Sequence, residues 1–125
     1  MRLVVARTAF LLLLVVSLVM FLMPAPEPSP ATPDDKLVHA LTFAALALSG
    51  LWARVPLVPL GLGLLGYAVL TETLQALLPI ERHGDALDAL ADAVGVVVVL
   101  GAALLLARRR HRDVMRSGSN SDHLV

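Results

Sequence analysis

The sequence predicts an all-α membrane protein: a polytopic helical bundle with about four transmembrane helices and both chain ends in the cytoplasm (N-in/C-in). The chain has 125 residues, of which 58% are hydrophobic and 16% are charged. An ordinary soluble domain is about 45–50% apolar and about 25% charged. The apolar residues also fall into four segments, separated by proline-rich or charged stretches. A water-soluble fold of this size could not bury so much apolar surface, so the bilayer must take it up.

Residues 1–23 are predicted to form an N-terminal transmembrane anchor. Residues 8–23 carry no charge, and Arg2 and Arg7 precede them. A membrane helix needs about 20 largely apolar residues, and the segment is long enough if Arg7 extends its side chain to the interface. A cleaved signal peptide has a similar start, but the prolines that follow leave poor cleavage sites and favour a retained anchor. The later helices are not expected to depend on this choice.

Residues 24–35 are predicted to form an extracytoplasmic linker. Five of the eight prolines lie between Pro24 and Pro33. This density of proline excludes a helix, because proline removes backbone donors and clashes with the preceding turn. A stiff, extended segment is expected instead.

Residues 36–107 are predicted to form a three-helix membrane domain, with helices at 36–53, 56–78 and 86–107. The middle helix contains GLGLLG at residues 61–66. This string matches a dinucleotide-binding fingerprint only formally, since it lies inside an apolar helix with no strand before it. Close packing between helices is the expected use of its glycines. Residues 108–125 are predicted to be a basic, disordered cytoplasmic tail.

The placement of the basic residues predicts the topology, because cytoplasmic loops of membrane proteins are rich in lysine and arginine. With the N-terminus inside, only Lys36 and Arg82 lie outside, and eight of the ten basic residues are cytoplasmic: Arg2, Arg7, Arg54, Arg108, Arg109, Arg110, Arg112 and Arg116. The formal net charge of zero indicates no nucleic-acid partner. The chain has no cysteine, which excludes disulfides and thiolate chemistry.

Polar side chains of the membrane helices gather at their extracytoplasmic ends. Within each helix they are three or four residues apart, which places them on one face. Asp85 fits a helix cap, but Glu72 and Asp92 lie roughly 10 Å inside the helices, too deep for a cap. Ionisable residues at that depth mark functional sites, with buried polar contacts between helices as the alternative. The predicted functional cluster consists of Asp35, Lys36, His39, Glu72, Gln75, Arg82, Asp88 and Asp92.

No metal or other cofactor is predicted, and catalytic roles are left unassigned. His39 is a single histidine in a helix, and such a residue is more often a hydrogen-bond partner of a carboxylate than a metal ligand. Arg82 is the natural counter-charge of Glu72 or Asp88. Together with Lys36 it could instead hold an anionic group.

These residues resemble the pattern of the VanZ-like family of bacterial membrane proteins. The resemblance covers residues 34–48 (DDKLVHALTFAALAL) and 72–104 (ETLQALLPIERHGDALDALADAVGVVVVLGAAL). Asp35, Lys36 and His39 fill an Asp-Lys-x-x-His motif, and the later positions are filled by Glu72, Gln75, Pro79, Arg82, Asp88 and Gly95. Asp92 departs from the pattern, because the family usually has Asn there. An ionised Asp only accepts hydrogen bonds, whereas Asn also donates them.

The resemblance implies a multi-pass protein of the bacterial cytoplasmic (inner) membrane with a role at the cell envelope. The family takes its name from a protein associated with raised teicoplanin resistance. The resemblance therefore makes glycopeptide antibiotic susceptibility a phenotype to examine. It does not imply that this chain confers resistance. Its biochemical mechanism does not follow from the resemblance.

Three functions remain open from the sequence. The cluster could bind a cell-wall or lipid-linked ligand or a partner protein. It could act as a membrane-embedded enzyme on a lipid-borne substrate, by acid–base or metal-assisted chemistry. The chain could also be a structural membrane subunit, in which glycine and alanine faces pack against other helices. Besides membrane lipids, the expected partners are such a ligand, a second copy of the chain or another membrane protein.

Overall fold

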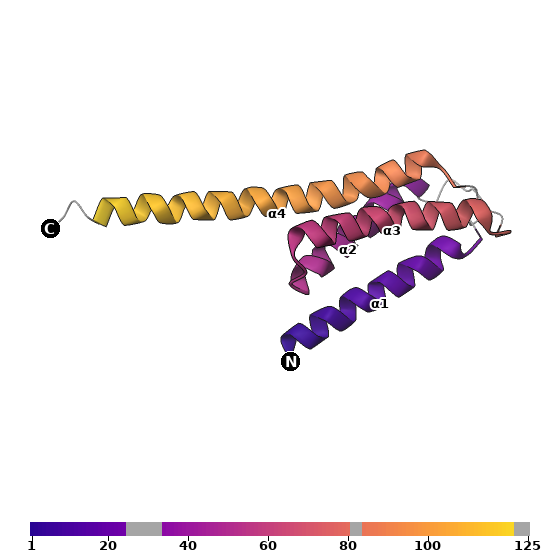
Figure 1. Ribbon diagram of the computed structural model, residues 1–125, viewed down its shortest axis with the longest axis horizontal. Helices are drawn as coiled ribbons and strands as arrows, with labels where there is room; N and C mark the ends of the chain where they lie inside the picture. Colours follow the sequence, from indigo (N-terminus) through magenta and orange to yellow (C-terminus); the bar gives the residue numbers. More distant parts are fainter. Residues whose placement is uncertain (25–33, 81–83, 122–125) are drawn as a thin grey trace.

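The computed structural model describes residues 1–24, 34–80 and 84–121, with side chains as far as Arg116. It contains four helices: α1 (Arg2–Leu22), α2 (Asp35–Trp52), α3 (Leu57–Leu77) and α4 (Ala86–Ser121). They alternate in direction along the bundle (Figure 1). The predicted all-α fold is confirmed. The bounds of the first three helices lie within two residues of the prediction, while most of the predicted linker lies outside the described residues.

Local sequence signals explain where three of the helices begin. The side chain of Asp34 accepts a hydrogen bond from the backbone N–H of Lys36 (2.9 Å) and so caps α2. Pro56 precedes α3, and Pro59 lies in its first turn, where a backbone N–H has no partner within the helix. The side chain of Asp85 accepts a hydrogen bond from the N–H of Leu87 (2.9 Å) at the start of α4, as expected for a cap.

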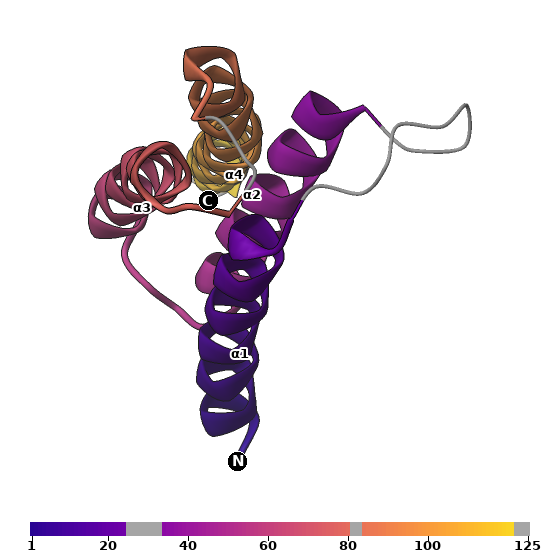
Figure 2. The ribbon, with the colours of Figure 1, turned by 90° about the vertical axis from the view of Figure 1, so that its right-hand side faces the viewer.

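Three of the described helices are long and apolar enough to cross a membrane: α1, α3 and the part of α4 from Ala86 to Arg116. The chain is therefore a multi-pass helical membrane protein by helix length and composition. The shorter α2 packs against the other three helices. Seen from the end of the bundle where α2 and α4 begin, α1 is inclined to α3 and α4 (Figure 2).

The last helix is longer than the sequence predicted. A helix end near Ala107 and a disordered tail were expected, but α4 continues to Ser121 and projects past the other helices (Figure 1). The prediction of disorder for residues 108–121 was wrong. Residues 108–117 contain neither proline nor glycine, and arginine is a good helix former, so nothing in this stretch breaks the helix.

Glycine permits the closest approach between α2 and α4. A Cβ atom on Gly95 would collide with the backbone of Ala40 and Ala44 on α2. The glycines of GLGLLG were predicted to pack closely against other helices, and only one of them does so in the described chain. Only a Cβ on Gly61 would meet a neighbouring helix, at the Leu100 side chain, whereas Gly63 and Gly66 meet nothing within 4 Å in the described chain. The tight packing therefore lies at the α2–α4 contact.

The end of the bundle opposite the α2–α3 connection holds the polar residues of the predicted cluster that the structure describes. The N-terminus of α1 and the α2–α3 connection share the other end, and α4 extends beyond it (Figure 1). The described arginines that were used to predict the topology lie toward the end that holds the α2–α3 connection. The arrangement is compatible with the N-in/C-in topology, which stays a prediction.

Candidate functional site

His39 forms the centre of the site. Its side chain projects from the second turn of α2 and is fully buried. Its Nδ1 lies 3.0 Å from Oδ1 of Asp92 on α4, within hydrogen-bond distance, and 3.7 Å from Oε1 of Glu72 on α3. Asp92 is completely buried and Glu72 is 9% exposed. Three helices thus bring together one imidazole and the two acidic residues that the sequence places farthest inside the helices.

A second layer of charge lies nearer the end of the bundle. The Lys36 ammonium contacts Oδ2 of Asp85 at 3.2 Å and Oδ1 of Asp88 at 3.1 Å. The N–H of Leu87 and the Lys36 ammonium both stabilise the Asp85 carboxylate and hold its pKa below the ordinary aspartate value. Lys36 is therefore engaged by carboxylates, and Arg82, its predicted companion in holding an anion, lies outside the described residues.

Glu72 also connects two helices. Its Oε2 accepts a hydrogen bond from the backbone N–H of Asp85 (2.8 Å), which fixes the start of α4 against the last turns of α3. Its other oxygen, Oε1, is buried and has no hydrogen-bond partner among the described residues. One carboxylate oxygen thus serves the fold, and the second faces the interior of the site.

The first helix closes one side of the site, contrary to the expectation that the later helices would not depend on it. The ring of Phe21 stacks on the His39 ring, with centroids 4.4 Å apart. Gln75, predicted as part of the cluster, donates from Nε2 to the Phe21 carbonyl oxygen at 2.9 Å. Gln75 therefore fastens α1 to α3. Sequence reasoning missed Phe21, because an aromatic residue in an apolar anchor carries no signal of a site.

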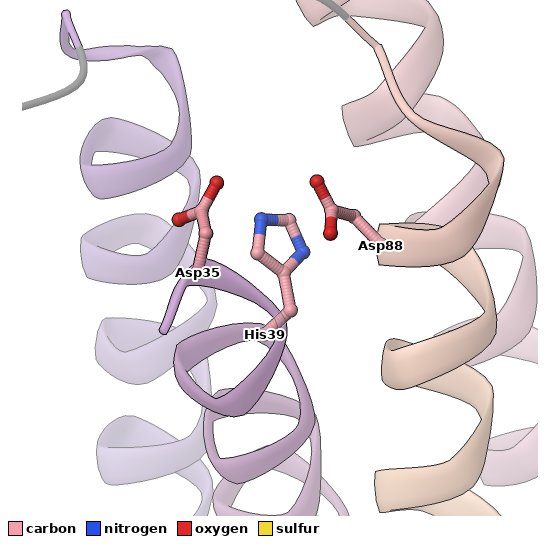
Figure 3. Close-up of side chains that lie close together, drawn as sticks. All are labelled: Asp35, His39 and Asp88. Carbon is pink, nitrogen blue, oxygen red and sulfur yellow. The ribbon is translucent and has the colours of Figure 1, made fainter. Parts of the chain in front are cut away.

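Two further carboxylates flank the imidazole. Asp35 and Asp88 lie on either side of His39 (Figure 3). One ligand-type atom from each of Asp35, His39 and Asp88 lies within 4.8 Å of the others, and the same is true of His39, Glu72 and Asp92. Asp35 is exposed, whereas Asp88 is 6% exposed. Asp35 is therefore the member of this set that reaches the surface.

Three buried polar atoms of the site have no hydrogen-bond partner in the part of the chain that the structure describes: Nε2 of His39, Oε1 of Glu72 and Oδ2 of Asp92. Buried polar atoms in folded proteins are nearly always satisfied, and exceptions deserve an explanation. The described cluster is also formally acidic, with five carboxyl groups against one ammonium and one imidazole: Asp35, Glu72, Asp85, Asp88, Asp92, Lys36 and His39.

The fold and the site define a helical membrane protein with an acidic, histidine-centred cluster at one end of its bundle. No protein-family model, curated protein or solved structure matches the chain.

Proposed function

We propose that the chain is a VanZ-like integral membrane protein of the bacterial inner membrane. In this proposal, its polar cluster faces the extracytoplasmic side and binds a cell-wall or lipid-linked ligand, or a partner protein. The single observation that carries the proposal is the meeting of Glu72 and Asp92 at His39, with an unsatisfied buried atom on each of the three side chains. The resemblance at residues 34–48 and 72–104 supports the placement at the cell envelope.

Binding explains these side chains better than a role in packing alone. A polar contact between helices is favourable when its groups satisfy one another. Leaving a buried donor or acceptor without a partner costs about 1–3 kcal/mol. A cluster that served only to join helices would gain nothing from three such atoms, whereas a ligand that enters the site can satisfy them.

The charge of the cluster restricts the ligand. Carboxylates outnumber cationic groups in the described part of the cluster, and Lys36 is already paired with Asp85 and Asp88. The site therefore suits a group that is cationic or rich in hydrogen-bond donors. This differs from the anionic group that Lys36 and Arg82 suggested in the sequence.

Complementation of a deletion strain tests the proposal. Glu72→Gln removes the carboxylate charge but keeps an amide oxygen that can accept the Asp85 N–H. At matched membrane abundance, we expect this variant to be as sensitive to envelope-acting antibiotics and detergents as the deletion strain. Asp113→Asn, on the exposed part of α4, is the matched control and should behave as wild type. Wild-type resistance of Glu72→Gln would contradict the proposal and leave Glu72 as a helix contact.

One observation favours an enzyme as the second candidate. The Asp92 carboxylate can orient the His39 imidazole through Nδ1, while Nε2 has no partner among the described residues. This arrangement suits general acid–base catalysis on a lipid-borne substrate. Purified protein incubated with envelope lipids should then release a product detectable by mass spectrometry, and His39→Gln should not. Equal product yields from the two proteins would reject the enzyme.

A further inference from the structure

We propose that Asp35, His39 and Asp88 form a site for a divalent transition metal, for which zinc is the probe, at the end of the bundle. This inference goes beyond the proposed function by placing a metal ion in the cluster, and it rests on that proposal in treating the cluster as a binding site. The sequence alone predicted no metal, because it showed one histidine in α2 without its spatial neighbours.

The geometry of the three side chains is close to that of a metal site. Their ligand atoms lie within 4.8 Å of one another, and the two aspartates lie on either side of the imidazole (Figure 3). Ligand atoms on one tetrahedral zinc ion lie about 3.3–3.5 Å apart, because zinc–ligand distances are about 2.0–2.2 Å. Rotation of the exposed Asp35 side chain and a small shift of Asp88 can supply the difference.

The orientation of His39 is the second, independent observation. An ionised Asp92 can only accept, so the 3.0 Å contact assigns the donated proton to Nδ1 and, in the neutral ring, the lone pair to Nε2. Nε2 is buried and has no hydrogen-bond partner among the described residues. A histidine that ligates a metal almost always donates its other ring N–H to a carboxylate, carbonyl or water. Asp92 is the carboxylate that would accept this hydrogen bond from His39, so it would orient the imidazole as a positioning residue.

The alternative set of His39, Glu72 and Asp92 is less suitable. A metal there would take Nδ1 as its ligand and would break the hydrogen bond that Nδ1 makes with Asp92. It would also leave Nε2 without a partner among the described residues. All three of those side chains are buried, whereas Asp35 gives the proposed set a route from the surface.

The donor set indicates the kind of ion. Imidazole nitrogen suits zinc and other transition metals, whereas magnesium and calcium prefer oxygen ligands alone. Three protein ligands would leave a fourth position for water or another ligand, as in open zinc sites. The Lys36 ammonium, 3.1 Å from Oδ1 of Asp88, would stay with Asp85 while Asp88 turns to the ion.

Zinc titration of the purified full-length protein tests the inference. After treatment with a chelator and reconstitution in nanodiscs, the wild type should bind a single zinc ion per chain, with magnesium and calcium failing to compete. Losing the hydrogen-bond partner of a ligating histidine weakens metal binding by up to about 100-fold. Asp35→Asn and Asp88→Asn remove direct ligands, so each should weaken zinc binding by at least about 100-fold. Asp34→Asn is the matched control. It changes the residue next to Asp35, keeps an oxygen that can cap α2, and should bind zinc as the wild type does.

Three results would overturn the inference: no zinc binding by the wild type, unchanged binding by Asp35→Asn and Asp88→Asn, or a loss confined to Glu72→Gln. Asp35 is exposed, so its substitution tests the site even if the buried His39 and Asp88 variants misfold. Cobalt(II) absorption gives a separate readout, and His39→Gln should abolish its nitrogen-ligated spectrum. If zinc does not bind but Glu72→Gln still resembles the deletion strain, the metal site fails and the proposed function stands.

Discussion

Phe21 of α1 lies almost face to face with His39 of α2, with ring centroids 4.4 Å apart and an angle of 24° between the ring planes. Both residues are buried, and Phe21 also stacks on Phe43 at 6.1 Å. The first helix is thus part of the wall of the site. A chain without α1 would expose the imidazole on this side.

Phe21→Ala should destabilise the bundle and disturb the site together. Phe→Ala substitutions in protein cores cost about 3–5 kcal/mol, and here the lost ring also covers His39. We expect a clear fall in the melting temperature in detergent and weaker ligand binding. Val19→Ala on the exposed face of α1 is the control and should change neither quantity. Equal melting temperatures for the two variants would show that α1 does not depend on Phe21 for docking.

Gly95→Leu should separate α2 from α4, because even a Cβ atom would collide with the backbone of Ala40 and Ala44. We expect the folded protein to be lost from detergent-solubilised membranes, measured by gel filtration. Gly66→Leu on α3 meets open space within the described chain and should leave the monomer folded. If Gly66→Leu alone disrupts the protein, this glycine packs against another chain, as the structural-subunit hypothesis requires.

Asp92→Asn should be tolerated, whereas Asp92→Leu should not. The amide oxygen of Asn can accept the hydrogen bond that Nδ1 of His39 now donates to Oδ1 of Asp92. Leu has the same branched arrangement of four side-chain heavy atoms, although it is larger, and it leaves the buried Nδ1–H unsatisfied, a loss of about 1–3 kcal/mol. Thermal stability in detergent measures both variants. Equal loss in Asn and Leu would mean that the charge of Asp92, and not its hydrogen bond, stabilises the cluster.

The predicted N-in/C-in topology can be measured directly, because the chain contains no cysteine. Ser29→Cys places a thiol in the predicted extracytoplasmic linker, and Ser117→Cys places one in the predicted cytoplasmic segment. A membrane-impermeant maleimide should label Ser29→Cys in intact cells and Ser117→Cys only after permeabilisation. The reverse labelling would place the polar cluster in the cytoplasm and remove its link to the cell envelope.

Much of the fold follows from the sequence because membrane helices are set by apolar length and by proline and charge at their ends. Those signals gave the starts of α2, α3 and α4 to within a residue. The length of α4 could not be read in this way. A run of exposed arginines is compatible with either a solvated helix or a disordered tail, and composition does not decide between them.

The cluster could be predicted in part. Depth inside the helices identified Glu72 and Asp92, since an ionisable residue there is costly in a bilayer. Helical spacing placed Asp88 on the face of Asp92, and His39 on the face of Lys36. The pairing among them could not be predicted, because it depends on how α2, α3 and α4 are rotated and spaced. The close approach at Gly95 and the contact of Phe21 with His39 are set by packing across more than one helix, which no local pattern reveals.

If residues from separate helices form one functional site, their substitutions should not act independently, because residues that act as a unit give strongly non-additive effects. Complementation by His39→Gln, Asp88→Asn and the double variant should therefore be compared at matched membrane abundance. We expect each single variant to be as sensitive to envelope-acting agents as the deletion strain, and the double variant to be no worse. Wild-type behaviour of the single variants, or partial losses that add in the double variant, would contradict the existence of one functional site.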